Sequence, residues 1–257
     1  MGFTFNGVTS QSMGINARLT NWTALPPLRN SFISIPGKSG VLDFGESASE
    51  RIIAVRCNIF PKYKFSALVD VLDNLAEWLN PDNRLKRLVF DDVPDRYFTA
   101  RLQDAVDCER LILSAGAFDL KFVCPDPFAY ALTDETYTIA AIGETTITRL
   151  AGNADSMPVY FIKGVIPQGA ASYVGITTNG EEIRVIGSLA LGETLIVDSG
   201  LLTSKVVDSN GVTLRNGLPL LQDLNFPVLK KGDNEINISV TGAEFIELKI
   251  QAMSRWR

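Results

Sequence analysis

Apolar and polar residues alternate with a period of two along most of this 257-residue chain. In "YFTARL", Phe98, Ala100 and Leu102 fall on one face, whereas Thr99 and Arg101 fall on the other. A β-strand places successive side chains on opposite faces of its sheet, so this pattern indicates strands buried on one side. The chain is therefore predicted to be mainly β.

The same alternation returns in three further segments. They are "FDLKFVC", predicted to bury Phe118, Leu120, Phe122 and Cys124; "EINISV", predicted to bury Ile236, Ile238 and Val240; and "FIELKIQA", predicted to bury Ile246, Leu248 and Ile250. Asn-Gly dipeptides stand at 179–180, 210–211 and 216–217. Because these dipeptides suit the tight turns of hairpins, we expect a hairpin at each.

One segment has the helical period instead. "FSALVDVLDNLAEWLNP" carries a leucine stripe at helical spacing, made of Leu68, Leu72, Leu75 and Leu79. Ser66 is expected to cap the start of this helix, and Asn80-Pro81 to end it, since a residue before proline avoids the α conformation. A stripe of this kind predicts a helix packed on a sheet.

The texture of the sequence changes at "CPDPFAYALTDETYT". Two prolines and a polar cluster follow a dense strand region, and short strands with many glycines come after them. This change predicts two domains: residues 1–133, a β-sandwich-type domain with one helix and a hairpin, and residues 134–257, a β-sandwich. The linker between about Ala131 and Tyr137 is expected to be exposed.

The stretch "LVFDDVPDRYFTARL" contains a D-D-x-x-D pattern at Asp91, Asp92 and Asp95, the spacing that gathers carboxylates around Mg²⁺ on a helix. Pro94 lies inside the pattern, where it disfavours a helix, and both flanks alternate as strands do. The six residues between Phe90 and Tyr97 are therefore interpreted as a hairpin loop, in which aspartate is a favoured residue. We expect no metal here.

Histidine is absent, and the three cysteines are widely spaced without a C-x-x-C pair. The absence of histidine excludes Ser-His and Cys-His catalytic pairs and nearly all catalytic zinc sites. Carboxylate chemistry stays open in principle, but no spacing among the 29 acidic residues singles out a pair. We therefore predict a protein that is not an enzyme, with no catalytic, cofactor-binding or metal-binding residues.

Charge and hydropathy limit the partners. A net charge of −5 disfavours a surface for nucleic-acid phosphates or anionic lipid, so neither nucleic acid nor membrane is an expected partner. No apolar run approaches the ~20 residues of a membrane span. The opening "MGFTFNGVTS" lacks the features of a secretory signal, and we expect synthesis in a cytoplasm.

An ordered set of segments resembles the distal tail protein family of phages with long, non-contractile tails. In the first half the set comprises "FTFNGVTSQSMGI", a turn at Pro36, Gly37 and Gly40 in "SIPGKSGVLDFGE", then "LAEWLN", "LVFDDVPDRYFTARL" and "GAFDLKFVCPDPFAYA". In the second half it comprises "LAGNADSMPVYFIKG", "ITTNGEEIRV", "LGETLIVD", "LKKGDNEINISV" and the closing "SRWR".

This resemblance implies a structural protein of the virion, at the tip of the tail. It implies a homohexameric ring, single or stacked in pairs, that joins the tail tube protein to the tail-associated spike and the receptor-binding protein. The second domain would be galectin-like. The hairpin around Asp91 to Asp95 is expected to reach a neighbouring subunit.

The alternative is a carbohydrate-binding adhesion module, because galectin-like sandwiches can bind sugars through exposed aromatic residues. Tyr173 in "PQGAASYVG" is the candidate residue for such binding.

Overall fold

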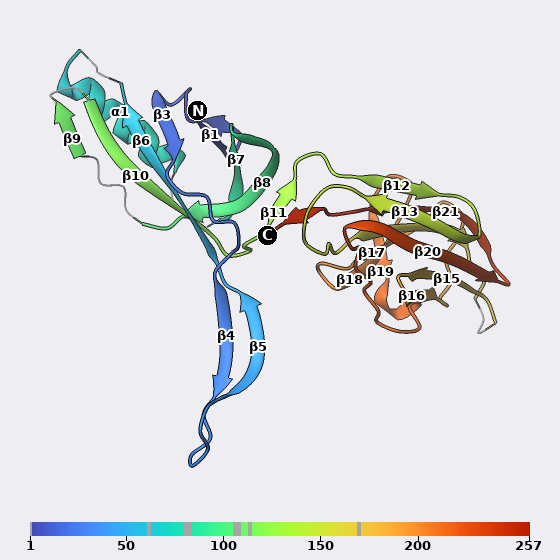
Figure 1. The fold of residues 1–257 in the computed structure, drawn as a ribbon. Helices are drawn as coiled ribbons and strands as arrows, with labels where there is room; N and C mark the ends of the chain where they lie inside the picture. The colour runs from blue at the N-terminus through green and yellow to red at the C-terminus, as the bar shows by residue number, and fades with distance from the viewer. Residues whose placement is uncertain (1, 61–62, 80–83, 105–108, 113–114, 169–170) are drawn as a thin grey trace. The chain divides into compact units, whose positions relative to one another are not determined.

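The computed structural model describes residues 2–60, 63–79, 84–104, 109–112, 115–168 and 171–257, with the side chains of 109–112 excepted. The chain divides into two compact units: unit 1, residues 1–132 together with Arg257, and unit 2, residues 133–256 (Figure 1). Both are built from antiparallel strands, so the prediction of a mainly β protein is confirmed. Among the described residues, no helix has the length and apolar character needed to span a bilayer.

Unit 1 is one antiparallel sheet with a helix and a separate hairpin. Its sheet runs β2-β1-β7-β8-β10-β6-β3, with β9 beside β10 and β11 beside β8, and its hairpin is β4-β5. The bounds are β1 (Phe3–Phe5), β2 (Val8–Thr9), β3 (Ile15–Leu19), β4 (Leu28–Ile33), β5 (Leu42–Ala48), β6 (Arg51–Ile59), α1 (Phe65–Trp78), β7 (Lys86–Phe90), β8 (Val93–Leu102), β9 (Glu109–Ile112), β10 (Ala115–Cys124) and β11 (Ala129–Ala131).

Helix α1 packs on this sheet through the predicted stripe. Leu68, Leu75 and Leu79 are buried. The ring of Trp78 stacks on Phe3 with centroids 5.5 Å apart, and its Nε1 donates a hydrogen bond to the Phe5 carbonyl over 3.1 Å. The helix is thus fastened to β1 by apolar contact and by one hydrogen bond.

The predicted ends of the helix have different outcomes. Ser66 is not the cap: α1 begins at Phe65, and Lys64 holds the N-cap position with an extended backbone and no side-chain hydrogen bond. Since aromatic burial fixes the helix, it does not depend on a capping hydroxyl. The predicted stop at Asn80-Pro81 lies outside the described residues.

The hairpin at "FDDVPD" is tighter than expected. Its turn consists of Asp91 and Asp92 alone, because Phe90 pairs with Val93 and β8 already begins there. The predicted six-residue loop is wrong. Residues 94–97 belong to β8 but lie in the irregular part of its ladder with β7, where Pro94 interrupts no regular pairing.

Unit 2 is a sandwich of two antiparallel sheets. One runs β12-β21-β14-β17-β18-β19 and the other β13-β20-β15-β16. The bounds are β12 (Thr136–Ile139), β13 (Gly143–Arg149), β14 (Val159–Val165), β15 (Tyr173–Thr178), β16 (Glu181–Val185), β17 (Thr194–Asp198), β18 (Thr203–Val207), β19 (Thr213–Asn216), the 3₁₀ helix η1 (Leu218–Leu220), β20 (Gly232–Thr241), β21 (Glu244–Gln251) and β22 (Arg255–Trp256).

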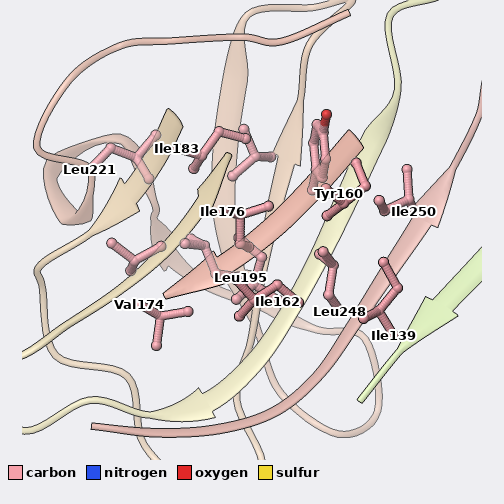
Figure 2. Packing of buried hydrophobic residues seen from close by; sticks show 14 of the residues in the cluster. Ile139, Tyr160, Ile162, Val174, Ile176, Ile183, Leu195, Leu221, Leu248 and Ile250 are labelled. Carbon is pink, nitrogen blue, oxygen red and sulfur yellow. The ribbon is translucent and has the colours of Figure 1, made fainter. Parts of the chain in front are cut away.

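The inner faces of these two sheets share one core. Ile162, Leu195 and Leu248 come from the larger sheet, and Val174 and Ile176 come from the smaller one (Figure 2). This is the interdigitation expected of a β-sandwich.

A β-bulge changes the predicted pattern in β21. Leu248 and Ile250 are buried as expected, but Ile246 is exposed, and the prediction for Ile246 is wrong. The ladder with β14 shifts between Lys163 and Gly164, so one extra residue of β21 enters there. Phe245 packs against the core instead. The extra residue reverses the faces on its far side.

The hairpins predicted at the three Asn-Gly dipeptides have different outcomes. Asn179-Gly180 joins β15 to β16 with positive φ at both residues, and Asn210-Gly211 lies between β18 and β19, as predicted. At Gly217, by contrast, β19 leads into η1, and the predicted hairpin is wrong. A Cβ at Gly217 would lie 2.4 Å from the Ser204 hydroxyl, so this glycine serves close packing rather than a turn.

Candidate assembly interface

The hairpin of unit 1 formed by β4, β5 and the turn between them, residues 28–48, is called the arm here. Among the described residues, β4 and β5 pair only with each other, and every residue of both strands is exposed except Leu42, which is half-buried. Figure 1 shows the arm extending away from the sheet and helix of unit 1. A two-stranded hairpin alone is at best marginally stable in water, so the arm has the properties of an element that packs against a partner.

The two faces of the arm differ. Ile33 lies opposite Leu42, and Phe44 follows on the same face because side chains alternate along a strand. Ile33 is 51% exposed and Phe44 62%. On the other face Phe32 lies opposite Asp43. Ile33, Leu42 and Phe44 thus form an apolar cluster toward the tip, called the apolar face of the arm, whereas the same side carries Arg29 and Ser47 nearer the base. The outer edges of β4 and β5 carry unpaired peptide groups that can accept a further strand.

Local chemistry explains the path of the arm. Gly37 and Gly40 in its tip have positive φ, which glycine adopts without steric cost. Gly45 also has positive φ, and its N–H donates to the Asp43 carboxylate over 2.8 Å where the β4–β5 ladder shifts register. This bulge bends the arm near its middle.

The base of the arm is anchored. Arg51, the first residue of β6, is 2% exposed; its guanidinium lies 5.5 Å from the Phe98 ring centroid and donates to the Thr23 carbonyl over 3.4 Å. Burial lowers the pKa of Arg51 from its ordinary value. Trp22 packs edge-on against Phe98 at 5.9 Å. The exposed arm therefore has a firmly packed base.

The sequence-based reasoning missed the arm. A signal was present, because short segments rich in apolar residues, "SFISI" and "VLDF", stand on either side of the Pro36-Gly37 turn. The sequence analysis assigns only a turn to this region, at Pro36, Gly37 and Gly40.

The structure does not gather Asp91, Asp92 and Asp95 around one point. Asp91 accepts from the Gln11 side chain over 3.3 Å, and Asp95 pairs with Arg96 over 2.9 Å. That hydrogen bond from Arg96 holds the pKa of Asp95 below its ordinary value. Within the described ranges, no group of three or more His, Cys, Asp or Glu residues could hold a metal ion.

Tyr173, the candidate sugar platform, lies at the start of β15. The Arg184 guanidinium stacks 4.6 Å from the centroid of its ring, so one face of the ring is occupied. A separate hollow of about 390 Å³ lies at β13, β20 and the β15–β16 turn, lined among others by Glu144, Thr177 and Asn237. Tyr173 is not among its lining residues.

Comparison with known families gives a match within unit 1. Residues 13–124 match the family described as phage tail protein RIFT-related domain. This segment, which holds the arm, α1 and the strands from β3 to β10, is similar to that domain family. Comparison with curated protein sequences gives no match.

The fold of the whole chain is similar to that of one particular protein. The Dit protein of phage SPP1, described as a paradigm of the hub adsorption apparatus in phages that infect Gram-positive bacteria, aligns with a TM-score of 0.74. The alignment covers 97% of this chain and 96% of that one at 16% identity, which shows a shared fold. The predicted resemblance to distal tail proteins is confirmed.

Two structures of the phage p2 baseplate in its activated conformation also align. The one with Sr gives a TM-score of 0.47 at 11% identity, covering 98% of this chain and 99% of that one. The one with Ca gives 0.44 at 12% identity, covering 92% and 90%. TM-scores below 0.5 do not establish a shared fold.

Proposed function

We propose that this protein is a structural component of a phage tail, the hub at its distal end. It closes into a homohexameric ring that joins the tail tube to the tail-tip spike and the receptor-binding apparatus. The full-length similarity of its fold to a hub protein supports this proposal. The observation that carries it is the arm, an exposed hairpin with one apolar face and no packing partner among the described residues.

The arm accounts for assembly into a ring. A ring requires a heterologous contact, in which one surface of a subunit meets a different surface of the next and the rotation closes. Each fully buried Leu, Ile or Phe side chain contributes about 1.5–3 kcal/mol, so covering the apolar face of the arm supplies a large driving force. Six copies, and the kinds of tail protein on either side of the ring, are what the resemblance implies. The net charge of −5 suits a ring through which DNA slides without being held.

The mass of the purified protein in solution tests this function. We expect about six or twelve times 28.1 kDa at high concentration, with dissociation on dilution, and rings in negative-stain images. Phe44→Ser and Ile33→Ser together should abolish the ring and leave unfolding unchanged, because both side chains are exposed in the single chain.

A matched variant separates the arm from the Asp91–Asp95 hairpin, which was also expected to reach a neighbour. Asp92→Ser alters an equally exposed hairpin turn of the same unit. If the arm makes the contact, Asp92→Ser leaves the ring intact. A wild-type protein that stays monomeric at every concentration, with no rings in the images, would contradict the proposed function.

Carbohydrate binding is retained as a second candidate on account of the hollow beside β13, β20 and the β15–β16 turn. Its carboxylate, amide and hydroxyl side chains suit the hydroxyl groups of a neutral glycan, and none of the described residues that line it is basic. Binding to neutral glycans on an array, lost in Glu144→Ala with Asn237→Ala, would establish this role. An array without signal would remove it.

A further inference from the structure

Unit 1 has a groove that the arm does not fill. The groove, called the α1 groove here, lies between helix α1 and the segment joining β1 to β3, and has a volume of about 630 Å³. Its lining includes Val8, Met13, Val71, Asn74, Glu77 and Trp78. A second hollow of about 270 Å³, lined in part by Ile15 and Phe60, shares Gly14 with it. The hollowed surface, with a mixed apolar and polar lining, therefore continues from the helix toward the edge strand β3.

We propose that the α1 groove receives the arm of the neighbouring copy of this chain. This inference rests on the proposed function and names the surface that the ring contact uses. The arm lies exposed in a single chain, so it does not occupy the groove of its own unit. Each chain thus carries one free apolar ridge and one free groove, the two unlike surfaces that a closing heterologous contact requires.

The polarity of the two surfaces matches. The apolar face of the arm, with Ile33, Leu42 and Phe44, meets a floor that includes Val71 and Trp78. Asn74 and Glu77 supply polar groups beside that apolar floor, as at protein interfaces with an apolar centre and a polar margin.

Charge is also complementary. The tip of the arm carries the exposed Lys38. Helix α1 exposes Asp70, Asp73 and Glu77, and Glu77 lines the groove. Opposite charges favour this docking and its orientation over a contact between two grooves, which would bring like charges together.

Disulfide trapping tests the contact. In a Cys108→Ser background, Ser39→Cys places a thiol in the arm tip and Asn74→Cys places one in the groove. Mild oxidation of this double variant should give a ladder of covalent species up to the closed ring on a non-reducing gel. Cys57 and Cys124 do not interfere, because they are buried and burial raises the pKa of each thiol to about 12.

A matched control variant tests whether the cross-link is specific to the α1 groove. Ser39→Cys combined with Asp119→Cys, whose thiol would lie on an exposed position of β10 outside both hollows, should give no ladder. Rings that form without any Ser39–Asn74 cross-link, or a cross-link within one chain, would overturn the groove assignment and leave the hub function standing. A protein that never forms rings would instead overturn the hub function.

A charge exchange provides a second measurement. Lys38→Glu and Glu77→Lys should each weaken the ring, so that it dissociates at a protein concentration at least several-fold higher than wild type. The two changes together should restore assembly. Asp73→Lys alters the same helix outside the lining and should have the smaller effect. Equal weakening by the single and double variants would show that the tip and the groove do not meet.

Discussion

Arg149 holds separate loops of unit 2 together through hydrogen bonds to their carbonyls. It is fully buried, and its guanidinium donates to the carbonyls of Lys230, Ala151 and Ala154 over 3.1, 3.2 and 2.7 Å. Burial lowers the pKa of Arg149, and the nearby Glu135 opposes that shift. One planar group thus fixes carbonyls from separate loops, a role to which its five donors are suited.

Replacing Arg149 with Met should lower the free energy of unfolding of unit 2 by about 3–5 kcal/mol, the scale for removing one partner from a buried charged network. The free energy of unfolding of Arg149→Lys should fall between those of wild type and Arg149→Met, because one ammonium cannot span the same three carbonyls. Denaturant unfolding measures the change, with the exposed Lys231→Met as control, expected within about 0.5 kcal/mol. An Arg149→Met variant as stable as wild type would show that the loops do not depend on these hydrogen bonds.

The buried cysteines provide a test of unit 1. Cys57 and Cys124 both have pKa values raised to about 12, in each case chiefly by burial. At pH 9, three units below that pKa, about one thiol in a thousand is ionised, and only the thiolate reacts. In the Cys108→Ser variant we expect negligible alkylation of folded protein at pH 8–9 and full labelling once denaturant is added. Rapid labelling under native conditions would contradict this burial.

At the scale of elements, the sequence identifies the regular strands and fails where a partner strand decides. Phe118, Leu120 and Phe122 are buried as their alternation predicts. Ile246 is not, because the bulge opposite Lys163 and Gly164 is set by β14, which lies far away in sequence. A Cβ at Gly164 would lie 2.5 Å from the Glu244 carbonyl, so the irregularity is built into the partner strand. No local pattern in the sequence of β21 predicts the bulge.

The bulge yields a paired prediction. Ile246 and Leu248 have the same parity in the sequence, yet only Leu248 is buried. Leu248→Ala should therefore cost about 2–5 kcal/mol of unfolding free energy, as for other buried leucines. Ile246→Ala should cost roughly 0.5 kcal/mol, as for a surface position. Chemical denaturation of the two variants side by side measures the difference, and equal losses would show that the alternation continues unbroken.

The candidate interface was the least predictable element. Period-2 alternation predicts one buried face, whereas the arm exposes both of its faces in the single chain. Its apolar residues therefore indicate a partner that the sequence of one chain does not display. The D-D-x-x-D stretch shows the converse, since Pro94 and the strand-like flanks were enough to predict a hairpin from local residues alone.

Hydrogen exchange follows the arm through assembly. In dilute, monomeric protein the amides of residues 28–48 should exchange within the shortest labelling times, because few apolar contacts protect them. In assembled protein they should become protected, whereas the buried strands β6 and β10 are protected in both states. Arm amides that exchange equally fast at all concentrations, in samples shown to contain rings, would exclude the arm from the contact.

At the scale of the whole molecule, unit 2 has a hydrophobic core of its own. Its core cluster draws only on residues 139–252, with Tyr137 packed against it. Its entering segment is also fastened internally: Asp134 accepts from the Met253 and Ser254 amides, and Glu135 accepts from the Leu150 amide over 3.0 Å. The proposed boundary near residue 133 places these fasteners with the sandwich that they close.

Residues 133–257 expressed alone should therefore fold and unfold in one cooperative transition. They should remain monomeric at concentrations where the full chain forms rings, because both the arm and the α1 groove are missing. Residues 140–257 form the matched control: they lack β12 and the two carboxylates, and should be markedly less stable, since the edge of β21 and the peptide groups of 253–254 lose their partners. Denaturant melts and sedimentation measure both properties.

Limited proteolysis of the full chain should first cut between about 131 and 137. First cuts within the sandwich strands, or an unfolded 133–257 fragment, would show that the two units fold only together.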